Sequence, residues 1–302
     1  MIKVSVILPI YNVAPYLDDA FQSLLTQTLS DIEIIAVNDG STDNSQERID
    51  HYAAKDSRII ALRQENQGLS GARNTALQHA RGEYIYMMDS DDILSSPDAL
   101  RKCYEYAVKN QADFIFFDGD RFLDGGSDCI STIKRTHLVE ENKKYDGEYL
   151  LNLMLDTGCH NSAVWLLLIN HDYMKRHELM FYPGIIHEDE LFTTVLTLNS
   201  NAIYCLKQSF VRHRVRSSSI MGLRYTKRNI SCYLTVADEL LKFQRSPIIQ
   251  KFLRYTLSKV FYTGHLIPVK DKPAVFWRAL RSGYLKYIGW KSSIVFWVKS
   301  AS

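Results

Sequence analysis

Five apolar runs divide the first 120 residues, and segments with a helical pattern lie between them. The run at 3–10 is almost continuously apolar, which is typical of a parallel strand buried on both faces. Further strands are predicted at 33–37, 58–62, 84–89 and 113–117. Helices are predicted at about 15–28, 43–55, 70–81 and 97–110. This alternation predicts an α/β fold with a Rossmann-like, mostly parallel sheet flanked by helices.

The pattern changes after residue 118. Residues 119–145 are polar and rich in Gly and Asp, which predicts a long loop or a hairpin. Two or three helices and one short strand, 202–206, are predicted over 146–220. From residue 225 onward the pattern is helical, with breaks expected at Pro247, Pro268 and Pro273. We therefore expect a catalytic or binding unit over 1–224 and a helical region over 225–302.

Composition narrows the class of protein. The chain has 302 residues, of which 46% are hydrophobic and 23% charged, so it can bury a full core. The longest apolar run, 163–169, is too short to span a membrane, and the N-terminus leads into a strand without a signal peptide. The five cysteines are scattered and form no C-x-x-C pair, which favours free thiols in a reducing cytosol. We expect a cytoplasmic protein.

The net charge of +2 hides an uneven distribution. Residues 245–302 hold eleven Lys or Arg and one acid, Asp271, together with eleven aromatic residues. Bases and aromatics interleave at 276–281 and 284–291, which suits an amphipathic helix on an anionic membrane surface. The alternatives are a helical region packed on the body, or a homodimer contact. The rest of the chain is net acidic, which argues against a nucleic-acid partner.

Polar clusters follow three predicted strands, at 11–12, 38–43 and 89–92. Ligands of parallel α/β sheets bind outside the carboxyl ends of the strands. Asp89 and Asp91 would point to the same side of an extended segment, and two close carboxylates need a cation between them. Oxygen ligands suit Mg²⁺ or Mn²⁺. The alternative is that these acids only start the next helix, although Ser95 or Ser96 with Pro97 could supply that cap.

Four further segments contain candidate functional residues, each weighed against a purely structural role. Ser41, Thr42 or Asp43 can cap a helix, whereas Asp39 ends an apolar strand and can bind a ring N–H or a ribose hydroxyl. Residues 66–74 open a helix with two glycines but lack the P-loop lysine and the dinucleotide spacing. Glu188-Asp189 either complements a helix dipole or provides a general base. The basic run 212–216 either binds a diphosphate or lies exposed.

Taken in order, these motifs resemble an inverting family 2 glycosyltransferase with the GT-A fold. The matching segments are 4–12, 38–43, 66–74 and 88–92, and the resemblance recurs at 188–189 and 214–220. It does not cover residues 225–302. The resemblance assigns donor contacts to seven residues: Pro9, Tyr11, Asp39, Arg73, Asp89, Ser90 and Arg214. It also implies Asp91 and His213 as metal ligands and Asp189 as the catalytic base.

The resemblance implies transfer of a hexose or N-acetylhexosamine from a UDP-sugar to a glycan hydroxyl, forming a β-linkage with Mn²⁺ or Mg²⁺. A lipid-linked oligosaccharide, lipopolysaccharide or capsule precursor is the expected acceptor, at the inner face of a bacterial cytoplasmic membrane. A non-catalytic nucleotide- or glycan-binding module is the alternative, favoured if Asp189 lay far from Asp91. A sugar nucleotidyltransferase would need a basic glycine-rich loop after the first strand, where residues 9–12 stand instead.

Overall fold

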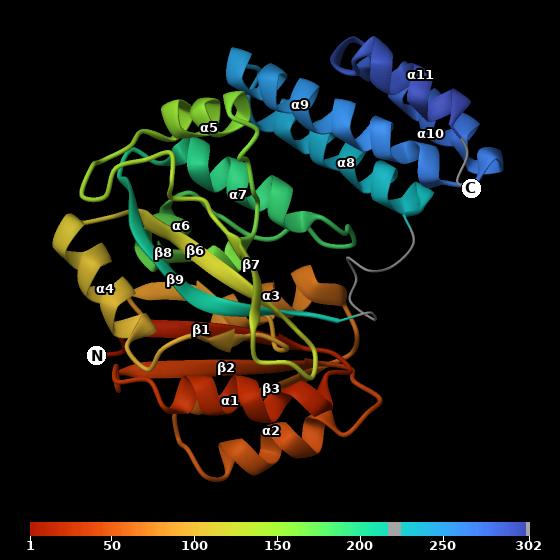
Figure 1. Cartoon of the computed structure of the whole chain (residues 1–302). Coiled ribbons are helices and arrows are strands. Elements are labelled where there is room, and N and C mark those ends of the chain that lie inside the picture. The colour runs from red at the N-terminus through yellow and green to blue at the C-terminus, as the bar shows by residue number, and fades with distance from the viewer. Residues whose placement is uncertain (217–224, 300–302) are drawn as a thin grey trace.

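The computed structural model describes residues 1–216 and 225–299, and its centre is one mixed sheet with helices on both faces (Figure 1). The strand order is β3-β2-β1-β4-β8-β6-β9-β5, and β7 pairs with β6 outside this path. The first four strands on this path are parallel: β1 (Val4–Ile10), β2 (Ile32–Asp39), β3 (Ile59–Gln64) and β4 (Tyr84–Met87). Their carboxyl ends therefore meet at one edge, as the sequence predicted.

The second half of the sheet contains both parallel and antiparallel strand pairs. It comprises β5 (Ile93–Leu94), β6 (Phe114–Leu123), β7 (Cys129–Ile133), β8 (Leu167–Asn170) and β9 (Ile203–Val215). The antiparallel β8 lies between β4 and β6, and β6 runs parallel to β9. β8 was not predicted, because a short run of Leu and Ile has no periodicity that separates strand from helix. The strand predicted at 202–206 is only the first part of β9, because polar residues begin at 207. The hairpin predicted within 119–145 is formed by β6 and β7.

Two helical layers cover the sheet. One apolar core contains residues of α1 (Leu17–Leu25), α2 (Ser45–Ala53) and α4 (Ala99–Asn110). The core on the opposite face contains residues of α3 (Gly68–His79), α5 (Gly147–Asp156), α6 (His171–Arg176) and α7 (Glu188–Asn199). Strand β1 supplies both cores, because Val6 and Leu8 face one and Ile7 the other. The predicted helices are present, with ends shifted by a few residues.

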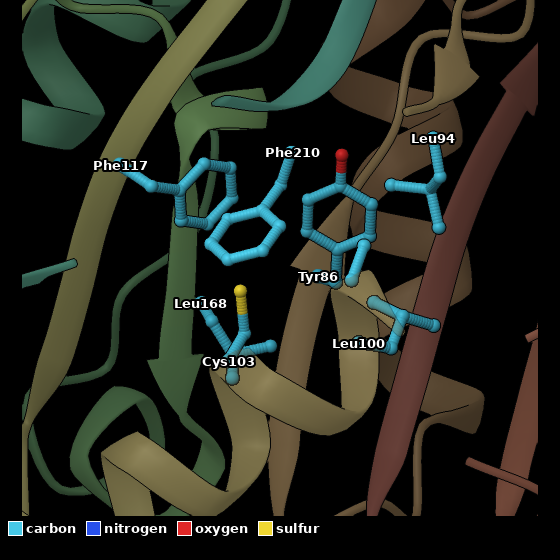
Figure 2. A pocket seen from close by; sticks show the side chains of 8 residues that line it. Tyr86, Leu94, Leu100, Cys103, Phe117, Leu168 and Phe210 are labelled. Carbon is cyan, nitrogen blue, oxygen red and sulfur yellow. The ribbon is translucent and has the colours of Figure 1, made fainter. Parts of the chain in front are cut away.

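The core between α4 and the sheet is close-packed (Figure 2). Tyr86, Phe117 and Phe210 pack there with Leu100 and Cys103 of α4. Phe117 and Phe210 meet edge to face, with ring centroids 5.4 Å apart. Burial raises the pKa of the Cys103 thiol above its ordinary value, so this cysteine is an inert core residue. We assign this region to the core and not to a ligand site.

Residues after 225 form helices, as predicted. They are α8 (Lys227–Phe243), α9 (Pro247–Thr263), α10 (Lys272–Arg281) and α11 (Trp290–Val298), with single 3-10 turns at 264–266, 269–271 and 284–287. A third core joins these helices to Leu151 and Leu155 of α5. Tyr284 and Tyr287 are buried in it, so part of the interleaved stretch 284–291 faces inward. No helix within 1–216 or 225–299 is long and apolar enough to cross a bilayer.

Candidate active site

The loops after β1 and β2 are joined at the predicted edge of the sheet. The Thr42 N–H donates to Oδ1 of Asn12 at 2.8 Å, and the Asn12 N–H donates to Oγ of Ser41 at 3.1 Å. Gly40 has a φ of +74°, and a Cβ there would lie 2.9 Å from the backbone nitrogen of Asn66. Only glycine combines this conformation with so close an approach. The ends of β1 and β2 and the segment before α3 therefore form one surface.

The base-pocket residues predicted from the resemblance lie at the carboxyl ends of β1 and β2. Asp39 is buried, and its Oδ1 accepts hydrogen bonds from Nε2 of Gln64 at 2.7 Å and from the Gln67 N–H at 2.8 Å. Asp39 thus holds the segment that leads into α3. Tyr11 directly follows β1 and is half exposed, whereas Pro9 is buried within β1. Contact of these three residues with a nucleobase stays a prediction.

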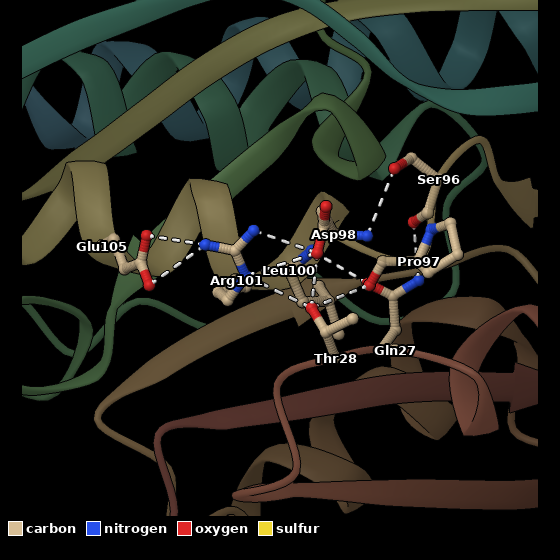
Figure 3. Close-up of polar contacts among 8 residues, drawn as sticks. All are labelled: Gln27, Thr28, Ser96, Pro97, Asp98, Leu100, Arg101 and Glu105. Atoms are coloured by element: carbon tan, nitrogen blue, oxygen red, sulfur yellow. Dashed lines mark hydrogen bonds and ion pairs between the residues drawn. The ribbon is translucent and has the colours of Figure 1, made fainter.

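The acids after β4 do not cap the helix that follows them (Figure 3). The Asp98 N–H donates to Oγ of Ser96 at 3.2 Å, and the Leu100 N–H donates to Oε1 of Gln27 at 3.0 Å. Arg101 pairs with Asp98 and Glu105 on the surface of α4. Oxygen atoms of Ser96 and Gln27, and not the acids at 89–92, therefore accept these two hydrogen bonds at the start of α4. The carboxylates of Asp89, Asp91 and Asp92 face Arg73, Arg216 and His213 instead.

Asp91 forms an ion pair with Arg216, which directly follows β9. Both Nε and Nη2 of Arg216 lie 2.7 Å from Oδ2 of Asp91, and the guanidinium lies 4.9 Å from the centroid of the Tyr16 ring. Burial and the charge of Asp89 raise the pKa of Asp91, although Arg216 and His213 act in the opposite direction. The Asp91 carboxylate thus has the Arg216 guanidinium as its cationic partner.

His213 and Asp92 form a second pair next to Asp91. Nδ1 of His213 lies 3.0 Å from Oδ2 of the fully buried Asp92, and the imidazole stacks on Trp165 with centroids 5.0 Å apart. Burial raises the pKa of Asp92 to about 7 against the effect of His213. Burial alone would lower the pKa of His213, but Asp92, Asp89 and Asp91 raise it. Since Asp92 engages Nδ1, Nε2 is the ring nitrogen that could bind a metal.

Arg214 is committed to other contacts. Its backbone N–H donates to Oδ1 of Asp92 at 2.9 Å, and its Nε–H donates to the Asp91 carbonyl at 3.0 Å. The guanidinium pairs with Asp19 at 2.7 Å and with Asp124 at 3.3 Å. Arg214 thus fixes the end of β9 to α1 and β6, and a donor contact by Arg214 stays a prediction. Of the resembling segment 214–220, residues 217–220 lie outside the described part of the chain.

Arg73 connects the acids after β4 with the start of α7. Its Nη1 lies 2.7 Å from Oδ1 of Asp189 and 3.0 Å from Oε1 of Glu188, and its Nη2 lies 3.1 Å from Oδ1 of Asp89. The Arg73 side chain is only 2% exposed. The three carboxylates raise the pKa of Arg73 above its ordinary value, against the effect of burial. The structure therefore brings Asp189 and Asp89 into one cluster.

Asp189 has the electrostatic setting of a base. Burial raises its pKa to about 7, Glu188 and Asp89 add to that effect, and Arg73 opposes it. Its Oδ2 accepts a long hydrogen bond, 3.4 Å, from the Val164 N–H. Such a pKa near neutrality suits proton transfer in either direction.

Two side chains of this site, Asp91 and His213, are of the types that bind divalent cations. The described residues contain no cluster of three or more His, Cys, Asp or Glu side chains arranged to hold a metal. Mg²⁺ and Mn²⁺, however, are commonly held by one or two protein carboxylates together with substrate phosphates. The Asp91 carboxylate and Nε2 of His213 are ligand types of this kind, and they lie close enough for each group to shift the pKa of the other.

Three contributors to this site were not singled out from the sequence. Arg216 was noted only within a basic run, and Asp92 only as the last acid of its cluster. Trp165 lies in an uninterrupted apolar run and gives no signal of its own, because its role depends on the pairing of β8 with β4 and β6.

Comparison with known proteins identifies the family of this chain. Residues 5–168 match the family described as Glycosyl transferase family 2. The chain is 34% identical over 281 residues to the glycosyltransferase EpsJ of Bacillus subtilis, covering 88% of this chain and 76% of EpsJ. It is 33% identical over 220 residues to the glycosyltransferase GlyA of Streptococcus pneumoniae, covering 72% of this chain but 31% of GlyA.

The structure also resembles solved structures. Staphylococcus aureus TarS 1–349 in complex with UDP-GlcNAc superimposes with a TM-score of 0.74 at 19% sequence identity. The match covers 97% of this chain and 84% of that one. At this level of identity the likeness establishes the fold.

Proposed function

The chain belongs to glycosyl transferase family 2 and has the GT-A fold, and on this premise we propose that it is a metal-dependent, inverting, UDP-sugar-dependent enzyme. It transfers a hexose or N-acetylhexosamine to a hydroxyl of a glycan acceptor, with a β-linkage as the product. The observation that carries the proposal is the guanidinium of Arg73, which touches both Asp89 and Asp189. A non-catalytic binding module has no need to place beside the donor site a half-buried carboxylate, Asp189, whose pKa lies near 7.

The donor site lies at the carboxyl ends of β1, β2 and β4. We propose that Tyr11 and Pro9 contact the base, that Asp39 accepts a hydrogen bond from the uracil, and that Asp89 and Ser90 contact the ribose. The UDP-GlcNAc complex of the similarly folded TarS supports a uridine donor.

We propose that Asp91 and Nε2 of His213 hold Mn²⁺ or Mg²⁺. When bound, the cation neutralises charge on the departing diphosphate. Asp92 orients His213 through Nδ1, and Trp165 fixes the plane of the ring by stacking. Arg216 adds a positive charge next to the same carboxylate.

Asp189 is the proposed base. An acceptor hydroxyl has a pKa far above 7, so its proton must leave as the new bond forms. The hydroxyl proton passes to Oδ2 of Asp189, the acceptor oxygen bonds to the anomeric carbon, and the bond from that carbon to the UDP oxygen breaks with its electron pair. A single displacement of this kind inverts the anomeric centre.

We further propose that the protein works at an anionic membrane surface on the cytoplasmic side, where a lipid-linked glycan acceptor would lie. The helices α10 and α11, side by side in Figure 1, keep an outward apolar surface. On α11 the residues Trp290, Ile294 and Trp297 follow helical spacing and are all exposed. The ring of Trp297 contacts Phe276 of α10, with centroids 5.3 Å apart, and Leu280 lies one turn further along α10.

Residues 272–299 contain six Lys or Arg and no acid, and Nζ of Lys291 lies 5.5 Å from the centroid of the Trp290 ring. Tryptophan next to lysine is the composition of an interfacial membrane site. A second copy of this chain is the competing occupant, and it would appear as a dimer in solution.

Calorimetry tests the donor and the metal together. UDP-Glc, UDP-Gal, UDP-GlcNAc, UDP-GalNAc and GDP-mannose are each titrated into the protein with Mn²⁺ and again with EDTA. Binding of one UDP-sugar in Mn²⁺ but not in EDTA is expected, and Asp91→Asn should abolish it. Binding of a UDP-sugar that is equally tight in EDTA would overturn the metal assignment. No binding of any donor would favour the binding-module alternative.

A further inference from the structure

We propose that Arg73 is a positioning residue for Asp189 and not a donor contact. This inference rests on the proposed function, because it assumes that Asp189 is the base. One guanidinium faces three carboxylates from two separate segments, namely Asp89 after β4 and the pair Glu188-Asp189 at the start of α7. Arg73 is thus the link that holds the start of α7 against the donor edge of the sheet.

The surroundings of Arg73 leave no room for a phosphate. Its guanidinium lies over the ring of Phe181, 4.9 Å from the centroid, and that ring stacks on Phe192 of α7 at 4.1 Å. Both Nη atoms already face carboxylates, and the side chain is almost inaccessible. A donor diphosphate would have to displace at least one carboxylate and approach the others against their charge.

The neighbouring residue reinforces the same attachment. Nδ2 of Asn74 donates to the carbonyl of Phe181 at 2.8 Å, and the Phe181 N–H donates to Oδ1 of Asn74 at 2.9 Å. Arg73 and Asn74 therefore hold both the backbone of the segment that precedes α7 and the first acids of α7. Arg73 and Asn74 of the 66–74 motif thus both serve to attach α7 and the segment before it to α3.

The geometry also selects which oxygen of Asp189 reacts. Oδ1 faces Arg73 at 2.7 Å, whereas Oδ2 has only the long contact with the Val164 N–H. Oδ2 is therefore the oxygen available to the acceptor proton. Arg73 also supplies the positive charge that opposes burial, Glu188 and Asp89, and so favours the ionised form that a base requires.

The test compares donor affinity with turnover in Arg73→Gln and Arg73→Lys. Affinity for the UDP-sugar that binds the wild type is measured by calorimetry with Mn²⁺, and turnover as UDP released with water or an aryl glycoside as acceptor. We expect donor Kd to change less than about threefold, while kcat of Arg73→Gln falls by about 10², the low end of what a positioned base contributes. Arg73→Lys should recover part of that loss.

The pH profile separates positioning from a general structural role. The charged groups that face Asp189 are Arg73 of α3, Asp89 after β4 and Glu188 of α7, while His160 and Glu190 nearby pair with each other. Arg73→Gln should move the acid limb of kcat/KM to higher pH, and Glu188→Gln should move it to lower pH. Glu188→Gln retains the Arg73 side chain and two of its three carboxylate partners, Asp89 and Asp189, so it tests the cluster even where Arg73→Gln fails to fold.

Two outcomes overturn the inference. One is a tenfold or greater loss of donor affinity in Arg73→Lys with an unmoved pH profile, which would make Arg73 a donor contact. The other is a Glu188→Gln variant in which the acid limb of the pH profile of kcat/KM stays where it is in the wild type. Failure of the proposed function is distinct, because the wild type itself would then bind no donor.

Discussion

The Arg216 guanidinium lies 2.7 Å from Oδ2 of Asp91, so the carboxylate that we assign to the metal already has a cationic partner. Arg216 directly follows β9, whereas Asp91 follows β4, and the two meet because β9 runs along β6 to the same edge of the sheet. A divalent cation that binds Asp91 must share this carboxylate with Arg216 or displace it.

Replacing Arg216 should therefore strengthen metal binding in the absence of donor. Arg216→Ala removes a competing charge next to Asp91, and we expect the Kd for Mn²⁺ alone to fall severalfold, as measured by calorimetry. Arg212→Ala is the matched control, because Arg212 lies on the same strand and bonds to the Ser127 carbonyl. Equal Mn²⁺ affinity in all three proteins would show that Arg216 does not compete with the metal.

The acid limb of the wild-type pH profile should report Asp189. Its pKa is raised to about 7, so the carboxylate is ionised above that pH and protonated below it. Only the ionised form accepts a proton, and kcat/KM should fall about tenfold per pH unit as pH drops below about 7. Asp189→Asn should bind donor nearly as well as wild type and lose about 10²–10⁴ of turnover. Full turnover in Asp189→Asn would refute the assignment of the base.

The placement of individual site residues at the ends of their strands and helices could be predicted from the sequence. Asp39 and Asp89 each follow a buried apolar run, and the order of parallel strands alone brings such residues to one edge. The start of α7 at Glu188 could also be read from the chain, because acids gather in its first turn. That the two groups meet through Arg73 required the structure, since residues 73 and 189 lie on different elements far apart in sequence.

The parts that the sequence did not yield depend on long-range pairing. Trp165 contacts His213 only because the short β8 inserts between β4 and β6. Similarly, composition could not tell which aromatics of the C-terminal region face outward. Tyr284 and Tyr287 fill a core that is shared with α5, whereas Trp290 and Trp297 remain exposed.

Exposed tryptophans of α11 should govern membrane binding. Trp290 is 70% exposed, and inserting such a ring into an interface is worth about 1.5–3 kcal/mol. Trp290→Ser should therefore weaken sedimentation with phosphatidylglycerol-containing vesicles by roughly tenfold or more, and salt should weaken it further. Tyr149→Ser is the control, because Tyr149 is an exposed aromatic residue of α5. Unchanged vesicle binding in Trp290→Ser would argue against membrane insertion of this ring. A wild-type dimer that dissociates in Trp290→Ser would argue for a protein partner on α11.

The contact between α5 and α7 should tolerate little added side-chain volume at Gly147. Gly147 begins α5, its N–H donates to the Ser200 carbonyl at 2.9 Å, and a Cβ there would lie 1.7 Å from the Thr197 carbonyl oxygen. Gly147→Ala must push α5 away from α7, which typically costs about 1–3 kcal/mol and can cost more. Because Leu151 and Leu155 of α5 lead into the third core, the displacement also loosens the C-terminal helices. Gly126→Ala is the matched control, since the nearest atom to its new Cβ is the Leu123 carbonyl oxygen at an ordinary 3.5 Å. Urea unfolding should give a lower midpoint for Gly147→Ala alone, and coincident midpoints for the two variants would mean that α5 accommodates the methyl group without moving.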